Sequence, residues 1–285
     1  MAFAPGQAQD GGVEKHTMDG ATLQAISVYR GKRRVLNDIT LTCPPGRITA
    51  FCGSNGAGKT TALSVLAGSL PPRSGDVLID GRPVYSTKPD ELARSRAVVA
   101  QNAALTFPFE VHEVVAMGRT PYFGRTSPEQ DNRAISSAIK AMALEPLAER
   151  NYLTLSGGER QRVNIARGLA QVWRHADDKT STRPWLFLDE PTSALDLKYQ
   201  LALMTLLLSL REKGWGIVIV LHDLHFIRRY ADDVAIFKSG ALTSFGDARE
   251  VLTPTTVQDA FDLEAPYLFE KTDGSASDQV VESSI

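Results

Sequence analysis

A glycine-rich segment carries the strongest chemical signal in the sequence. Residues 53–60 read GSNGAGKT and match the pattern G-x-x-x-x-G-K-[ST]; they lie between an apolar run, ITAFC, and a helical pattern, TTALSVLAG. Glycines at this spacing let backbone N–H groups turn toward phosphate oxygens, and the helix that follows adds its positive end. Lys59 is expected to reach the β- and γ-phosphates, and the Thr60 hydroxyl to bind Mg²⁺. The segment predicts a phosphate-binding loop.

Two adjacent carboxylates, Asp189 and Glu190, follow the apolar run 186–188. Because the carboxyl ends of parallel strands meet at one edge of a sheet, both are expected beside the phosphate-binding loop. There Asp189 would hold Mg²⁺, through water, and Glu190 would polarise an attacking water as a general base. Apolar residues followed by Asp-Glu are a weak signal alone, and they gain weight from the loop.

A second anion site is indicated at residues 155–162, which read LSGGERQR. Ser156 and Glu159 have the spacing of a helix capping box. Gly157 and Gly158 would each cost such a helix about 1 kcal/mol relative to alanine. They make sense if the backbone must approach another group closely, and a helix N-terminus with a serine hydroxyl can bind an anion. The chain is therefore expected to have two phosphate-binding ends.

The pattern of elements predicts an α/β fold. Strand-like runs alternate with helical patterns, which favours a parallel sheet. Residues 105–171 are mostly helical in pattern, with a helix start at Ser127–Gln130, and are expected to be inserted into this core. Residues 21–271 are expected to form one domain between flexible ends at 1–20 and 272–285. The expected strands are 22–28, 35–43, 48–52, 185–188 and 217–221, with a hairpin of 234–237 and 241–245.

Composition excludes several classes of protein. Among 285 residues, 31 basic and 33 acidic side chains give a net charge of −2, which argues against a nucleic-acid partner. No run reaches the ~18–20 apolar residues of a membrane span, and the first residues lack a secretory signal. The two cysteines form no metal or redox pattern and are expected in the core. These features predict a soluble, cytosolic protein.

The motifs and their order resemble those of ATP-binding-cassette (ABC) ATPases, over roughly residues 22–250. The resemblance implies a P-loop NTPase (RecA-like) core with an N-terminal antiparallel β subdomain and an inserted α-helical subdomain. It implies that Gln101, after a strand at 97–100, senses Mg²⁺ and the transporter domain, that residues 193–196 form the D-loop, and that His222 contacts the γ-phosphate.

ATP and Mg²⁺ are the cofactors that the resemblance implies. The implied catalytic residues are Glu190, His222 and Gln101, and the implied metal-binding residues are Thr60, Gln101 and Asp189. The residues expected to contact ATP are Gly53, Ser54, Asn55, Gly56, Ala57, Gly58, Lys59, Thr60 and Thr61, together with Ser156, Gly157, Gly158 and Glu159.

One position departs from the family's pattern. Family members place an aromatic ring a few residues after the first strand, where it stacks on adenine. Here Arg30 occupies that position, and Tyr29 precedes it by one residue. Either the Arg30 guanidinium stacks on the base, or the loop shifts to present Tyr29.

Four further segments indicate the branch of the family. Residues 107–122 resemble ATPases that serve iron-siderophore, cobalamin and haem importers. Residues 154–159, residues 191–197 and an extra polar stretch at 172–184 look most like the haem-import branch. A ferric-siderophore or cobalamin importer stays open, as does a soluble ATPase of iron–sulfur assembly.

The resemblance also implies a set of partners. Two copies would form a head-to-tail homodimer, with ATP between the phosphate-binding loop of one chain and residues 156–159 of the other. The dimer would sit on the cytoplasmic face of the bacterial inner membrane, beneath a transmembrane permease dimer. It would drive import of haem delivered by a periplasmic haem-binding protein.

Overall fold

The structure is a computed structural model, and it describes residues 19–101, 105–173 and 183–264. The expected flexible ends lie outside these ranges, except for residues 19 and 20. Most of the polar stretch at 172–184 lies outside them as well.

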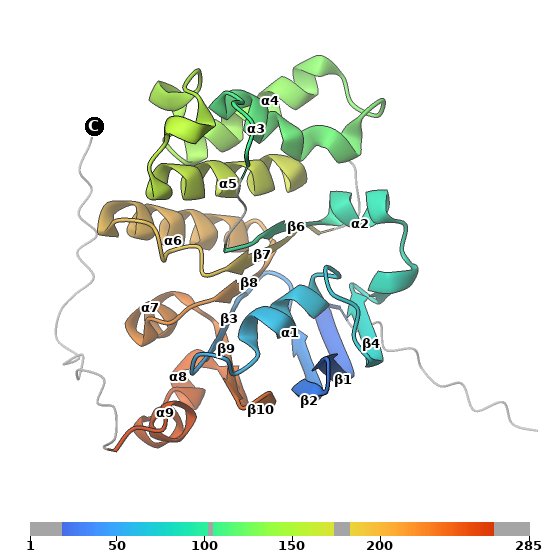
Figure 1. Ribbon diagram of the computed structural model, residues 1–285, viewed down its shortest axis with the longest axis vertical. Coiled ribbons are helices and arrows are strands. Elements are labelled where there is room, and N and C mark those ends of the chain that lie inside the picture. The colour runs from blue at the N-terminus through green and yellow to red at the C-terminus, as the bar shows by residue number, and fades with distance from the viewer. Residues whose placement is uncertain (1–18, 102–104, 174–182, 265–285) are drawn as a thin grey trace, which may run out of the picture.

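A six-stranded sheet forms the centre of the molecule (Figure 1). Its strand order is β10-β9-β3-β8-β7-β6; five strands are parallel, and β10 joins the edge as the antiparallel arm of a hairpin. Every residue of β3, β7 and β8 is buried, which explains why these strands read as continuous apolar runs. The strands are β3 (Ile48–Gly53), β6 (Arg96–Val99), β7 (Trp185–Asp189), β8 (Gly216–Val220), β9 (Asp233–Lys238) and β10 (Ala241–Asp247).

A four-stranded antiparallel sheet forms the N-terminal subdomain. Its order is β2-β1-β4-β5. Helix α1 (Lys59–Leu66) shares one apolar core with this sheet and with one face of the central sheet, and Phe51 and Phe237 of the central sheet contact each other there. The strands are β1 (Ala21–Arg30), β2 (Arg33–Cys43), β4 (Ser74–Ile79) and β5 (Arg82–Pro83).

Helices cover the other face of the central sheet. The inserted subdomain packs α3 and α4 against α5 at the top of Figure 1. Its elements are α3 (Val111–Ala116), η2 (Met117–Tyr122), α4 (Pro128–Ala141), η3 (Glu145–Leu147), η4 (Tyr152–Thr154) and α5 (Gly157–Val172). The remaining helices are η1 (Val84–Ser86), α2 (Pro89–Ser95), α6 (Leu197–Glu212), α7 (Leu224–Tyr230), α8 (Ala248–Val251) and α9 (Pro254–Phe261).

The architecture confirms the expected fold class. The strand runs, the C-terminal hairpin and the helical insertion all lie where the sequence predicts them, and Cys43 and Cys52 are both buried. Helix α4 begins at Pro128, with the Ser127 hydroxyl accepting from the Gln130 backbone N–H. The boundaries of the strands differ from the expected ones by one or two residues; β6, for example, spans Arg96–Val99, whereas the expected range is 97–100.

Candidate functional site

The phosphate-binding loop joins β3 to α1, and two of its glycines are required by their surroundings. Gly53 and Gly58 have φ angles of 138° and 107°, in a region that side chains disfavour. A Cβ on Gly53 would lie 2.0 Å from the Phe237 carbonyl oxygen, and one on Gly58 would lie 2.7 Å from Leu36 Cδ2. The loop therefore lies tightly between β9 and β2.

Lys59 closes the loop from inside. Its side chain is only 5% exposed, and Nζ donates hydrogen bonds to the Gly53 and Ser54 carbonyl oxygens at 2.9 and 3.0 Å. Burial lowers the pKa of Lys59, and the nearby charge of Glu190 acts in the opposite direction. The ammonium group is thus held at the centre of the loop.

The Thr60 hydroxyl, in the first turn of α1, meets the Asp189 carboxylate at the carboxyl end of β7. The Thr60 hydroxyl donates a 3.0 Å hydrogen bond to Asp189 Oδ1. Asp189 is 5% exposed, and burial raises its pKa, although the Thr60 hydrogen bond lowers it in part. A hydroxyl and a carboxylate are ligands that Mg²⁺ prefers, and Mg²⁺ commonly takes its remaining ligands from phosphates and water. The pair therefore fits Mg²⁺.

Glu190 joins two side chains that follow neighbouring strands. Gln101 Nε2 donates to Glu190 Oε2 at 2.6 Å, and His222 Nε2 lies 2.6 Å from Glu190 Oε1. These residues follow β6, β7 and β8, which are adjacent in the sheet, so one edge brings them together. Glu190 itself has a φ of 48°, a conformation uncommon outside glycine. Both of its carboxylate oxygens are engaged.

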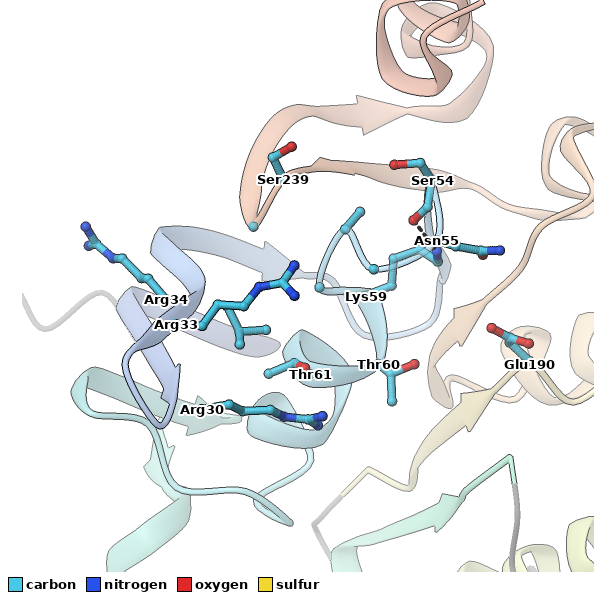
Figure 2. A pocket seen from close by; sticks show the side chains of 15 residues that line it. Arg30, Arg33, Arg34, Ser54, Asn55, Lys59, Thr60, Thr61, Glu190 and Ser239 are labelled. Carbon is cyan, nitrogen blue, oxygen red and sulfur yellow. Dashed lines mark hydrogen bonds between the residues drawn. The ribbon is translucent and has the colours of Figure 1, made fainter.

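A cleft of about 800 Å³ lies over the loop, within the size range of small-molecule sites (Figure 2). Loop residues 54–61 line it, with Glu190 on one side of the loop and Arg30 and Arg33 on the other. Its lining residues are Arg30, Arg33, Arg34, Val35, Ser54, Asn55, Gly56, Ala57, Gly58, Lys59, Thr60, Thr61, Glu190, Ser239 and Gly240.

Five of these lining residues are not among the site residues expected from the sequence: Arg33, Arg34, Val35, Ser239 and Gly240. The basic run 32–34 was a possible signal for the first two. Ser239 and Gly240 reach the cleft because β9 lies beside β3, and no local pattern indicates this pairing. Of the two candidates for the base, Arg30 lines the cleft, whereas the Tyr29 ring lies 5.9 Å from the Arg34 guanidinium.

Residues 156–159 lie away from this cleft, and none of them lines it. They cap α5: the Ser156 hydroxyl accepts from the Glu159 N–H, and Glu159 Oε2 accepts from the Ser156 N–H at 2.8 Å. A Cβ on Gly158 would lie 2.8 Å from the Ala194 carbonyl oxygen, whereas one on Gly157 would meet open space. The capping box and one close backbone approach are both present.

Comparison with known proteins agrees with this geometry. The family model described as ABC transporter matches residues 36–193, more than half of the chain. The chain belongs to the ABC transporter family. It is 41% identical over 244 residues to the hemin import ATP-binding protein HmuV of Hahella chejuensis, covering 86% of this chain and 93% of the relative. The HmuV protein of Gloeobacter violaceus is 41% identical over 239 residues, covering 84% and 86% respectively.

Solved structures of the ABC family share this fold. A bacterial ABC transporter cassette, MJ0796, solved as a dimer, superposes with a TM-score of 0.70 at 29% identity, over 80% of this chain and 99% of that chain. An ATP-binding subunit of an ABC transporter gives a TM-score of 0.71 over 87% and 95%, and at 24% identity it supports the fold alone. This chain is therefore an ATP-hydrolysing transporter subunit. Within the described ranges, no helix is both long and apolar enough to cross a bilayer.

Proposed function

We propose that this ABC ATPase drives the import of haem. The main support for this proposal is the similarity of the chain to six relatives that are named hemin import ATP-binding proteins, at 38–41% identity over 83–86% of the chain. An ATPase of this family does not touch the transported molecule. The cargo assignment therefore rests on the relatives, and the ATPase assignment rests on the site.

The proposed assembly is a head-to-tail homodimer beneath a transmembrane permease dimer. Ser156–Glu159 do not line the cleft of their own chain, so a second chain would have to bring its copy of these residues to the nucleotide. The dimeric MJ0796 cassette supports this arrangement. The proposed location is the cytoplasmic face of the bacterial inner membrane, with haem delivered by a periplasmic binding protein.

In the proposed mechanism, the loop holds the triphosphate. Backbone N–H groups and the N-terminus of α1 neutralise phosphate oxygens, and Lys59, already at the centre of the loop, adds a positive charge. Thr60 and Asp189 would hold Mg²⁺, which supplies further neutralisation of charge when it is bound. These groups position the terminal phosphate at the edge where Glu190 lies.

Glu190 then acts as the general base. It accepts the proton of the attacking water. Gln101 and His222 each contact one of its carboxylate oxygens, and they therefore orient it. We propose that Gln101 also helps to hold Mg²⁺ and that His222 contacts the γ-phosphate as the glutamate engages water.

Copurification and transport test the proposal. The chain is purified with its permease and reconstituted in liposomes, and ATP-dependent uptake of haem, a ferric siderophore and cobalamin is compared. We expect uptake selective for haem, and its loss in Glu190→Gln. Selective uptake of a siderophore or cobalamin would refute the haem assignment and leave the ATPase intact. Copurification with scaffold proteins and no permease would favour iron–sulfur assembly.

A further inference from the structure

Two arginines face each other at one end of the nucleotide cleft. Arg30 ends β1, Arg33 begins β2, and the two are paired directly across the hairpin. Both line the cleft. In Figure 2 their guanidinium groups point toward the side of the phosphate-binding loop, whereas Arg34 turns away.

This arrangement is unfavourable for the fold by itself. Like charges directly opposite one another in an antiparallel pair are destabilising. Within the described part of the chain, neither Arg30 nor Arg33 forms an ion pair with a carboxylate. Lys32, in the turn between them, adds another positive charge. A ligand that is anionic or rich in π electrons would relieve this repulsion.

The geometry of the cleft indicates which part of the nucleotide reaches these arginines. Glu190 lies on the opposite side of the loop from Arg30 and Arg33 (Figure 2). If the triphosphate lies on residues 53–61 with its terminal phosphate toward Glu190, the ribose and base extend toward the β1–β2 turn. This step rests on the proposed function.

No aromatic side chain lines the cleft among the residues that the structure describes. Tyr29 is the nearest candidate in sequence, and its ring faces Arg34, which is held by a 3.0 Å hydrogen bond to Ser27 Oγ. The planar groups available to the base are therefore the two guanidiniums.

We propose that Arg30 and Arg33 hold the base of the nucleotide against their guanidinium planes, and that the chain accepts GTP as well as ATP. A guanidinium stacks on the face of an aromatic system, and such stacking tolerates different bases because each has a π face. Guanidinium N–H groups also suit the O6 and N7 acceptors of guanine. This contact does not select adenine over guanine.

Equilibrium binding without Mg²⁺, where hydrolysis is prevented, separates the base from the phosphates. The probes are ATP, GTP and inorganic triphosphate, titrated into the full-length chain by calorimetry. The variants are Arg30→Lys and Arg33→Lys, which keep the charge and lose the planar fork, and Arg33→Ala, which loses both. Arg82→Ala, in β5 and outside the cleft, is the matched control for loss of a positive charge.

We expect wild-type affinities for ATP and GTP within about 5-fold of each other. Each lysine variant should bind both nucleotides about 3- to 10-fold more weakly and bind triphosphate like the wild type. Arg33→Ala should lose affinity for triphosphate as well, but less than for ATP. Arg82→Ala should match the wild type for all three probes.

Three outcomes would overturn the proposal. Lysine variants that bind ATP like the wild type would show that the charges act only at a distance. Equal losses for ATP and triphosphate in Arg33→Ala would place the contact on phosphate. A wild-type preference for ATP above about 20-fold would refute purine tolerance. If the wild type binds neither ATP nor triphosphate, the nucleotide site itself fails instead.

Thermal unfolding without nucleotide distinguishes a ligand contact from a structural role. If Arg33 serves the nucleotide, Arg33→Ala should unfold at the wild-type temperature or above it, because the repulsion with Arg30 is removed. Its stabilisation by ATP should shrink. A lower unfolding temperature with an unchanged ATP shift would mean that Arg33 supports the hairpin, and the proposal would fail.

Discussion

The Thr60 hydroxyl donates a hydrogen bond to Asp189 Oδ1 across 129 positions of sequence, and the two atoms lie 3.0 Å apart. The contact ties the first turn of α1 to the end of β7. The Asp189 carboxylate is almost entirely buried, and the Thr60 hydroxyl that donates to it carries no charge. Because burial disfavours its charged form, this carboxylate would stabilise a bound cation better than it stabilises the empty fold.

The first prediction follows from the pKa of Asp189. Asp189→Asn should leave the nucleotide-free protein as stable as the wild type or more stable. Burial raises the pKa of Asp189, so the folded state holds its proton more tightly than the unfolded state does, and the contribution of this group to stability falls as pH rises. The stability difference between variant and wild type should therefore grow as the pH rises above about 4, the ordinary pKa of an aspartate.

Urea unfolding between about pH 4 and about pH 7 measures this stability difference. Thermal unfolding with ATP, with and without Mg²⁺, tests the role of Asp189 in metal binding. The asparagine oxygen still accepts from Thr60, so packing is preserved. Added Mg²⁺ should increase the ATP-induced shift in the wild type and leave it unchanged in Asp189→Asn. A variant that still responds to Mg²⁺ would remove Asp189 from the metal site.

The second prediction concerns Lys59. Lys59→Ala should lower ATP hydrolysis by at least about 100-fold, because the positive charge at the centre of the loop is lost where phosphate charge must be stabilised. Steady-state release of phosphate measures it. Lys213→Ala, at the end of α6, is the control and should hydrolyse like the wild type. Normal turnover by Lys59→Ala would refute its assignment to the triphosphate.

The third prediction separates chemistry from assembly. Glu190→Gln should bind ATP–Mg²⁺ and remain dimeric without turnover, because the amide keeps the size of the side chain and removes the base. Its oxygen can accept from Gln101 and its N–H₂ can donate to His222, so both contacts survive. Light scattering with ATP–Mg²⁺ should give twice the chain mass of 31.0 kDa. A monomer that hydrolyses ATP normally would contradict both roles.

The fourth prediction tests the packing of the loop. Gly53→Ala places a Cβ 2.0 Å from the Phe237 carbonyl oxygen at a φ of 138° and should destabilise the fold by about 3 kcal/mol or more. At roughly 2 °C per kcal/mol or more, the unfolding temperature falls by at least about 6 °C. Gly124→Ala, at a φ of 71° in open space, carries the backbone strain without the clash. Equal decreases in unfolding temperature in the two variants would show that β9 shifts to accommodate the extra methyl group.

Local sequence patterns predict most of the strands and the helix caps named above. They do not predict which strands lie next to each other in the sheet. Strands β7 and β8 are buried on both faces and read as unbroken apolar runs. The capping boxes at Ser127 and Ser156 are purely local, and both are present as expected. Such features depend on residues within one turn of a helix or one strand.

The neighbours in the sheet depend on contacts between residues far apart in the chain. Strand β9 pairs with β3, and this pairing brings Ser239 to the phosphate-binding loop. No periodicity in residues 233–238 indicates that partner. The Gln101–Glu190 contact likewise spans 89 positions. The family resemblance identifies Gln101 and Glu190 as site residues. That they contact each other depends on β6 and β7 being neighbours in the sheet.

The distance of Ser156–Glu159 from the cleft of the same chain has a genetic consequence. In the proposed dimer, a subunit with Lys59→Ala and a subunit with Ser156→Arg form one site that carries both lesions and another that carries neither. Two alleles that are each inactive alone would then complement when they are expressed together, whereas the same two changes placed in one allele would not rescue either of them. In that dimer one gene would encode each chain, whereas each catalytic site would be built from half-sites of two chains.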